Sequence, residues 1–378
     1  MRFISVRIPF RPAGAEPSAE YTENSRNRQL FREIPDLFFP RKTPILERPE
    51  KPGRPYGTER SPRIRRNGRK RLTHISHETM KRFVWMLLLL PIGLQAQVRT
   101  ERLLEKGWRF TRDDAPAFAE PSYDDSRWQE VTVPHDWAIY GPFSAGNDLQ
   151  HTAIAQDGQT QAVEHAGRTG GLPFVGTGWY RLRFEVPERN EGRRCTLLFD
   201  GAMSHARVYV NGREAIRWPN GYNSFHTDIT PLLNPGGENL LAVRLENLPE
   251  SSRWYPGAGI YRNVHLIVTD EAHVPVWGTQ IITRRADEAS ARHRQSAGAD
   301  FGDHCFEQEF TIDRPALWSP DTPALYTSTS EIYEGGELKD RYVTVFGIRT
   351  VEAVQGEGFR LNGKPLKFRG VCLHHDLG

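Results

Sequence analysis

Between Gly107 and Ile267 the chain alternates apolar and polar residues in short runs, and Gly, Pro, Asn and Asp separate one run from the next. β-Branched and aromatic residues at period two predict β-strands, and no helical period of comparable length intervenes. Many short strands without crossover helices predict an antiparallel sandwich or jelly roll. The clearest predicted strands are Trp179–Val186, Cys195–Phe199, Ala206–Val210, Leu240–Leu245 and Asn263–Val268.

Two Asn-Gly pairs predict tight hairpins. Asn211-Gly212 follows the strand that ends at Val210, and Asn362-Gly363 divides the stretch from Gly358 to Phe368. A type I′ turn needs two residues that tolerate positive φ, and Asn-Gly supplies both.

A second β segment covers residues 273–350, with four predicted strands: Val274–Ile282, Cys305–Ile312, Leu325–Tyr333 and Arg341–Ile348. An immunoglobulin sandwich needs about seven strands in about 100 residues, so this segment is short. The shortfall falls on Arg284–His304, a polar stretch without strand period. We interpret it as a deletion or a short frame disruption and expect a poorly closed domain. A natural loop in a truncated sandwich is the alternative.

The first 79 residues show no helical or strand period. They hold 18 Lys and Arg against 9 Asp and Glu, a net charge of +9. Because the whole chain has a net charge of +3, the remaining residues carry −6. Such a segment cannot bury enough apolar surface to offset its chain entropy, and we expect disorder. We favour an upstream extension with translation beginning at Met80. A basic arm that binds nucleic acid is the alternative, and the acidic body itself predicts no nucleic-acid partner.

Residues 80–96 have the pattern of a signal peptide. Lys81 and Arg82 precede an apolar run from Phe83 to Leu90, and Ala96 occupies a plausible cleavage point. The run is too short to cross a bilayer of about 30 Å, so we expect no membrane span. The predicted location is secreted or periplasmic.

Three cysteines, Cys195, Cys305 and Cys372, cannot form a disulfide framework, and no Cys/His spacing indicates a zinc site. The composition, with 38% hydrophobic, 11% aromatic and 26% charged residues, is that of a globular chain and not of a coiled coil or fibre.

Six motifs occur in one order over about 170 residues, and together they resemble the N-terminal sugar-binding domain of glycoside hydrolase family 2. They are Gly107–Phe110, Tyr123–Trp128, Val133–Trp137, Gly178–Arg181, Phe199–Gly201 with Val210–Gly212, and Gly257–Arg262. The resemblance implies a mainly β protein. It would have a jelly-roll domain at residues 98–270, an incomplete immunoglobulin-like domain at 273–350 and, at 351–378, the start of a (β/α)₈ barrel that is truncated after its first strand. The stretch Ser251–Arg262 is most similar to the β-galactosidase branch.

By the same resemblance, Gly370–Leu373 would be the first barrel strand, and residues after such strands line the active site. A retaining glycosidase needs two carboxylates about 5–5.5 Å apart, and in this family both are glutamates from later in the barrel. We therefore predict no catalytic residue here and no hydrolysis by this chain alone.

Five side chains are candidates for contact with a sugar. The resemblance places His374 and Asp376 at the barrel mouth, and Arg253 and Trp254 on a loop that approaches it. Packing at a domain interface is the alternative for Arg253 and Trp254. Asp136 has the chemistry to accept hydrogen bonds from sugar hydroxyls, although a turn residue that caps its own backbone is the alternative.

We predict no metal ligands. His374 and His375 are adjacent on a predicted strand and would point to opposite faces. Mg²⁺ occurs in some family members, through barrel residues that this chain lacks, so no cofactor is expected.

The predicted function is that of the N-terminal part of a secreted retaining β-glycosidase acting on terminal β-galactosides. Its partner would be a β-linked oligosaccharide or glycoside. The alternatives are a non-catalytic carbohydrate-binding sandwich, or a piece of a β-glucuronidase or β-mannosidase. The sequence gives no basis for an oligomeric state.

Overall fold

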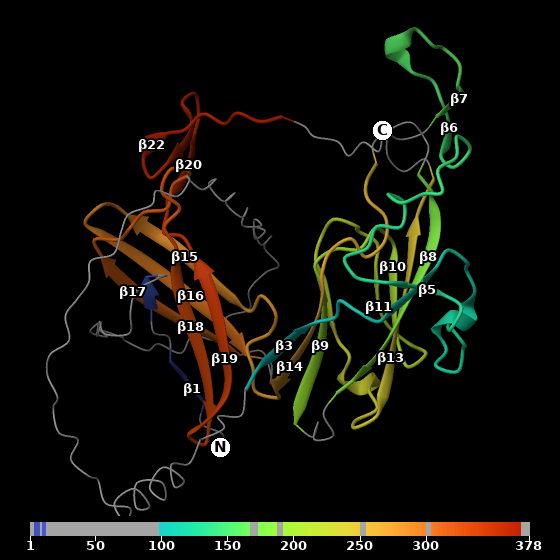
Figure 1. The fold of residues 1–378 in the computed structure, drawn as a ribbon. Helices are drawn as coiled ribbons and strands as arrows, with labels where there is room; N and C mark the ends of the chain where they lie inside the picture. The colour runs from blue at the N-terminus through green and yellow to red at the C-terminus, as the bar shows by residue number, and fades with distance from the viewer. Residues whose placement is uncertain are drawn as a thin grey trace, which may run out of the picture. The chain divides into compact units, whose positions relative to one another are not determined.

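A computed structural model describes residues 4–7, 10–12, 98–166, 173–186, 192–249, 255–299 and 304–371. Within these ranges the chain is almost entirely β-strand and loop, with three short 3₁₀ turns and no α-helix (Figure 1). The turns are η1 (Pro116–Ala119), η2 (Ala155–Asp157) and η4 (Thr230–Leu232). The mainly β fold predicted from the alternating pattern is confirmed.

The first domain is an antiparallel sandwich of two sheets. The six-stranded sheet has the order β11 (Arg213–Trp218), β10 (Ala206–Val210), β13 (Glu238–Asn247), β8 (Gly176–Glu185), β4 (Trp108–Thr111) and β5 (Gln129–Val131). The four-stranded sheet has the order β12 (Phe225–Asp228), β9 (Arg193–Phe199), β14 (Val264–Asp270) and β3 (Thr100–Leu103). A separate hairpin pairs β6 (Leu149–Thr152) with β7 (Val163–Ala166).

The predicted strands of this sandwich lie where the alternating pattern placed them. Each inner face contributes to one continuous apolar core that includes Trp108, Leu197, Phe199 and Leu241. Burying a side chain of this size stabilises the fold by about 1.5–3 kcal/mol. The hairpin predicted at Asn211-Gly212 joins β10 to β11, and φ is positive at both residues (52° and 79°).

The second domain also contains two sheets. One has the order β15 (Thr279–Ala286), β16 (Ser290–Ala299) and β17 (His304–Asp313). The other pairs β18 (Tyr326–Glu334) with β19 (Glu337–Phe346). Together they form the immunoglobulin-like part of the chain, built from five of its own strands.

The prediction that Arg284–His304 has no strand structure is wrong. Strand β16 occupies the middle of that stretch, and it pairs in continuous register with β17 and, with one bulge, with β15. The strand alternates as a strand should, but Ala291, His293 and Gln295 are the residues that point inward. Hydrophobicity alone does not reveal this alternation. The strand predicted at Val274–Ile282 also begins later, at Thr279.

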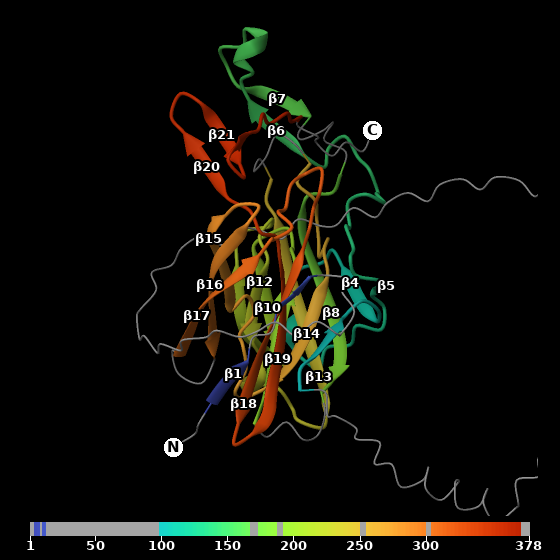
Figure 2. The same cartoon turned by 90° about the vertical axis from the view of Figure 1, so that its left-hand side faces the viewer.

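The expectation of disorder is wrong for seven residues of the N-terminal leader. Strands β1 (Ile4–Arg7) and β2 (Phe10–Pro12) both pair with β18 in antiparallel register. Both views show β1 alongside β18 (Figure 2). The predicted signal peptide at 80–96 lies outside the described residues.

A third, small sheet follows, with the order β20 (Val351–Val354), β21 (Gly358–Leu361) and β22 (Lys364–Pro365). The predicted turn at Asn362-Gly363 joins β21 to β22, again with positive φ at both residues (52° and 73°). The barrel strand predicted at Gly370–Leu373 is not evident, because Gly370 and Val371 are not in a strand and Cys372 and Leu373 lie outside the described residues.

A buried ion pair links the segment before β3 to the second domain. The Arg99 guanidinium donates from Nε and Nη2 to the two carboxylate oxygens of Asp340, over 2.9 and 2.7 Å. Asp340 is fully buried and also accepts the backbone N–H of Val274 at 2.8 Å. The carboxylate therefore has three donors, which is what makes its burial tolerable.

Candidate carbohydrate-binding site

The structure describes one of the five side chains predicted to contact a sugar. Asp136 lies in the loop after β5. Arg253, Trp254, His374 and Asp376 lie outside the described residues, so their proposed contacts remain predictions.

The Asp136 carboxylate ties two loops of the first sandwich together. Its Oδ1 accepts the backbone N–H of Ala138 at 3.0 Å, which closes the turn that Asp136 begins. Its Oδ2 accepts the N–H of Ala258 at 3.2 Å, and the Tyr255 hydroxyl donates to Oδ1. Asp136 therefore caps its own turn and also connects it to the loop after β13.

Backbone hydrogen bonds fix the second of these loops from several sides. His135 N–H donates to the Ile260 carbonyl at 2.8 Å, and Met203 and Gly259 exchange two bonds of 2.9 and 3.1 Å. Gly259 has φ +88°, and a Cβ there would lie 2.3 Å from the Tyr180 hydroxyl oxygen. Only glycine fits this position, because both the backbone angle and the space exclude a side chain.

Aromatic rings from three elements form a buried floor under these loops. Phe110 from β4 stacks on Trp137 with ring centroids 5.7 Å apart, and Tyr180 from β8 lies 4.8 Å from Phe110. His135 Nδ1 is 2.8 Å from the Tyr180 hydroxyl. Burial, with the nearby Arg112 charge, lowers the pKa of His135 to about 4, and burial raises the pKa of Tyr180 above its usual value. Both groups are therefore neutral at pH 7, and they support the loops instead of exchanging protons.

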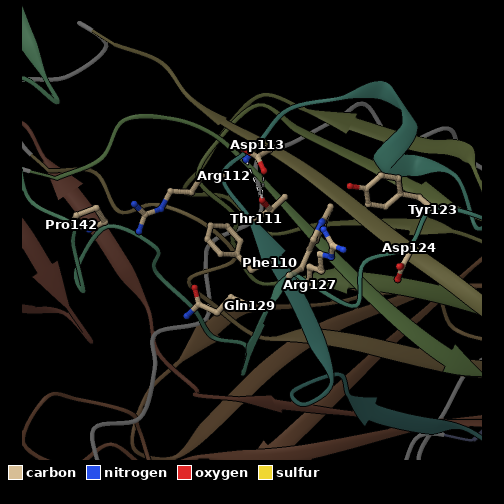
Figure 3. A pocket seen from close by; sticks show the side chains of 10 residues that line it. Phe110, Thr111, Arg112, Asp113, Tyr123, Asp124, Arg127, Gln129 and Pro142 are labelled. Carbon is tan, nitrogen blue, oxygen red and sulfur yellow. Dashed lines mark hydrogen bonds between the residues drawn. The ribbon is translucent and has the colours of Figure 1, made fainter.

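A shallow pocket of about 570 Å³ opens beside this floor (Figure 3). Its lining mixes aromatic rings, an aspartate pair and two arginines: Phe110, Thr111, Arg112, Asp113, Tyr123, Asp124, Arg127, Trp128, Gln129 and Pro142. Rings that stack on C–H faces and planar groups that pair with hydroxyls are typical of sugar recognition.

One pocket arginine is fixed and the other is exposed. Arg112 donates to the Gly141 carbonyl, and its guanidinium lies 5.1 Å from the Phe174 ring centroid. Arg127 and Asp124 are solvent-exposed at the pocket rim. The pocket can therefore offer hydrogen bonds to a ligand from its rim without breaking the packing beneath.

Sequence reasoning gave no separate role to His135 or Arg112, and it considered Tyr255 only as part of the loop with Arg253 and Trp254. Tyr255 follows the two loop residues that were singled out, and the glycines at 257 and 259 were the signal that its loop is tightly packed. Arg112 gives no local signal, because its partners come from the distant loop at 137–141.

The described part of the chain contains no group of three His, Cys, Asp or Glu side chains able to hold a metal ion. It also contains no helix with the length and apolar character needed to cross a membrane. Neither Cys195 nor Cys305 is in a disulfide, and Cys372 lies outside the described ranges.

Two family models match the chain over the two sandwiches. The model described as "Glycosyl hydrolases family 2, sugar binding domain" matches residues 102–270, and the model described as "Glycosyl hydrolases family 2" matches residues 264–349. Together they cover residues 102–349, more than half of the chain.

Relatives agree over the same region. A β-galactosidase of Bacteroides ovatus is 36% identical over 306 residues, which are 72% of this chain and 34% of the relative. A β-glucuronidase of Bacteroides fragilis is 26% identical over 77% of this chain and 43% of its own length. The crystal structure of a β-glycosidase from Bacteroides vulgatus superposes with a TM-score of 0.63 at 29% identity, over 72% of this chain and 37% of that one. The chain spans about a third to two fifths of these proteins.

Proposed function

Because this chain belongs to glycoside hydrolase family 2, we propose that it is the N-terminal part of a secreted retaining β-glycosidase that hydrolyses terminal β-galactosides. The observation that carries the substrate class is the 36% identity to the Bacteroides ovatus β-galactosidase, against 25–28% to four proteins named as β-glucuronidases over similar spans. Secretion is supported by the signal-like pattern of residues 80–96.

The role proposed for the first sandwich is to present loops to a substrate held elsewhere in the protein. The hydrogen bond between Asp136 and Tyr255 holds the two loops together at one edge of the β-sandwich. Trp254 directly precedes Tyr255 in the sequence. A side chain is held accurately when its neighbours are locked by packing and hydrogen bonds. Residues 253 and 254 would then touch the sugar, and Asp136 would act by positioning their loop.

The described residues do not supply the chemistry of hydrolysis in this proposal. Retention needs an accessible carboxylate nucleophile and a second carboxyl as acid/base about 5–5.5 Å away. The Asp136 carboxylate accepts three hydrogen bonds from the protein, and the adjacent His135 is partly buried and neutral. Neither is suited to attack a glycosidic carbon.

An activity assay on two proteins tests the proposal. Purified chain 1–378 should not turn over p-nitrophenyl β-galactoside. A protein extended by whatever the gene encodes after Gly378 should hydrolyse the galactoside at least tenfold faster than the corresponding β-glucuronide. Turnover by the 378-residue chain that disappears in Asp136→Asn would refute the first point, and preference for the glucuronide would refute the second.

The pocket favours a second candidate, carbohydrate binding by the first sandwich alone. Its rim carries Asp124 and Arg127 beside the Tyr123 ring. Titration of the chain with methyl β-galactoside, followed by tryptophan fluorescence, distinguishes the two functions. Millimolar or absent binding fits a supporting domain, whereas submillimolar binding lost in Arg127→Ala would establish a binding module.

A further inference from the structure

The second domain has an open position in one of its sheets. A seven-stranded immunoglobulin sandwich divides into sheets of four and three strands. Here residues 273–350 give three strands to one sheet and only β18 and β19 to the other. The outer edge of β18 would therefore face solvent if the chain supplied nothing else.

Strands β1 and β2 occupy that edge. Ile4 to Arg7 pair with Glu334 to Glu331, and Phe10 to Pro12 pair with Ser328 to Tyr326. Seven of the nine residues of β18 thus have a partner on this side.

The edge has a reason to be covered. An uncovered strand presents a row of unpaired N–H and C=O groups, which bind other extended chains. Directly behind it, β18 points Ser328 and Ser330 into the domain, where Gln295 bonds to both over 2.9 and 3.3 Å. Hydrogen bonds in a polar interior of this kind are stronger where water is excluded.

Charge matches the segment to the edge. Residues 4–12 carry Arg7 and Arg11 and no acidic residue, and β18 carries Glu331 and Glu334 and no basic residue. Arg7 lies opposite Glu331 in the register, and the Glu331 carboxylate also pairs with Arg341 over 2.8 Å. The complementarity favours this segment over an arbitrary strand.

We propose that the outer edge of β18 is a strand-docking site, and that it is occupied by residues 4–7 and 10–12 of this chain, bound as an exchangeable arm. The arm adds to the sheet by backbone hydrogen bonds, as in recognition by β-augmentation. Since 85 residues separate Pro12 from Val98, the arm is not held in place by a short turn, and the same segment supplied as a separate peptide should take its position.

A peptide-binding experiment tests the site. Four prolines in the full chain (Ser5→Pro, Val6→Pro, Phe10→Pro and Arg11→Pro) remove backbone N–H donors along both edges of the arm, including the edge that faces β18. A fluorescent peptide of residues 1–14 should then bind this variant with micromolar affinity, and at least tenfold more weakly to the unaltered chain, whose edge is filled. Hydrogen exchange of β18 amides should be at least tenfold faster in the variant and should slow again when the peptide is added.

A conservative variant is the matched control. Ser5→Thr, Val6→Ile, Phe10→Tyr and Arg11→Lys keep β-forming residues and charge, so peptide binding should stay as weak as in the unaltered chain. Exchange in β8 should be unchanged in every variant, which reports that the first sandwich is folded. Equal peptide binding by the unaltered chain and the proline variant, or β18 exchange that does not change, would overturn the proposal.

Discussion

The two sandwiches are built alike from antiparallel strands, but different residues fill them. Between the sheets of the first lies a continuous apolar core rich in Trp, Phe, Leu and Val. The interior of the second has two small apolar clusters, and Gln295, Ser328, Ser330 and His293 are buried beside them. The first domain can therefore carry strained loops at its edge, because packing stabilises it. The second depends on satisfied hydrogen bonds and on closure of its sheet edge.

The largest effect is expected at Arg181, whose charge is buried on the face of β8 opposite to the core, against Tyr123 and Trp128. Arg181 on β8 is fully buried, is 2.6 Å from Asp125, and donates to the carbonyls of Phe118, Glu120 and Tyr123. Arg181→Met should lower the free energy of unfolding by about 3–5 kcal/mol, because it leaves a carboxylate and three carbonyls without their donor. Urea denaturation followed by tryptophan fluorescence measures it.

Arg183→Met is the matched control two residues further along the same strand. Arg183 pairs with Glu238, and both side chains are exposed (41% and 58%). The loss should stay below about 1 kcal/mol. Equal losses at the two arginines would contradict the view that burial decides the effect.

Glycine replacements compare the crowded loop of the first domain with an open turn of the second. Gly259→Ala meets the Tyr180 hydroxyl and the His135 carbonyl in addition to its positive φ, and should cost about 2–4 kcal/mol. Gly335, in the β18–β19 turn, has φ +59° with nothing near its Cβ position. Gly335→Ala should cost only about 1 kcal/mol. Thermal unfolding of both variants measures the difference in stability. A larger loss of stability in Gly335→Ala than in Gly259→Ala would contradict the prediction.

Acid should weaken both domains through one histidine in each, the partly buried His135 and the buried His293. Burial lowers the pKa of His135 and of His293 to about 4 from the usual 6.5. Above pH 6.5 both are neutral whether the chain is folded or unfolded. Between pH 6.5 and 4 the unfolded chain takes up the protons first, so stability falls, by on the order of 2 kcal/mol per histidine. Urea midpoints measured across this range should rise at pH 5 in His293→Gln relative to the unaltered chain.

Alkali should weaken the first domain alone. His265 lies 3.1 Å from Asp200 and 2.7 Å from Glu101, and these carboxylates raise its pKa to about 9. The stabilisation that protonated His265 gives the folded chain is complete below pH 6.5, and it is lost as the pH rises to 9. Because both carboxylates are partly exposed, we expect about 1–2 kcal/mol. A flat profile between pH 6.5 and 9 would show that the pairs contribute nothing, and His265→Gln should flatten it.

The smallest effect sharpens the contrast between the interiors. Ser328→Ala breaks one bond to Gln295 and should cost about 1 kcal/mol. Replacing all three polar residues (Gln295→Leu, Ser328→Ala and Ser330→Ala) leaves no unsatisfied partner, so the triple variant should be as stable as the unaltered chain or more stable. Denaturant midpoints of the single and triple variants measure these changes in stability. If the losses of stability from the three substitutions simply add, the three residues do not act as one cooperative network.

The same difference in interiors explains what could be predicted from sequence. Strands such as Trp179–Val186 were predictable because their inward residues are apolar and their outward ones polar. Strand β16 was not predictable, since its inward positions are Ala291, His293 and Gln295. The pairing of β1 and β2 with β18 joins residues more than 300 positions apart, and no local pattern indicates it.

For the candidate site, the sequence identified the loops but not what joins them. Asp136 was recognised as a turn residue or a sugar ligand, and its bonds to Tyr255 and Ala258, 119 and 122 residues away, had no local signature. Hydrogen bonds between distant loops depend on strand order, which alternation does not encode.

Under the proposed secretion, the ion pair between Arg99 and Asp340 would limit where a processing enzyme can cut. Removal of residues up to Ala96 leaves Arg99 as the third residue of the new terminus, still able to reach the carboxylate. Trimming by three further residues would delete Arg99 and leave the buried Asp340 carboxylate without its partner. The free energy of unfolding should then fall by about 3–5 kcal/mol. The cut after Ala96 would also remove residues 4–12, so the shortened chain would keep its ion pair and present an open β18 edge.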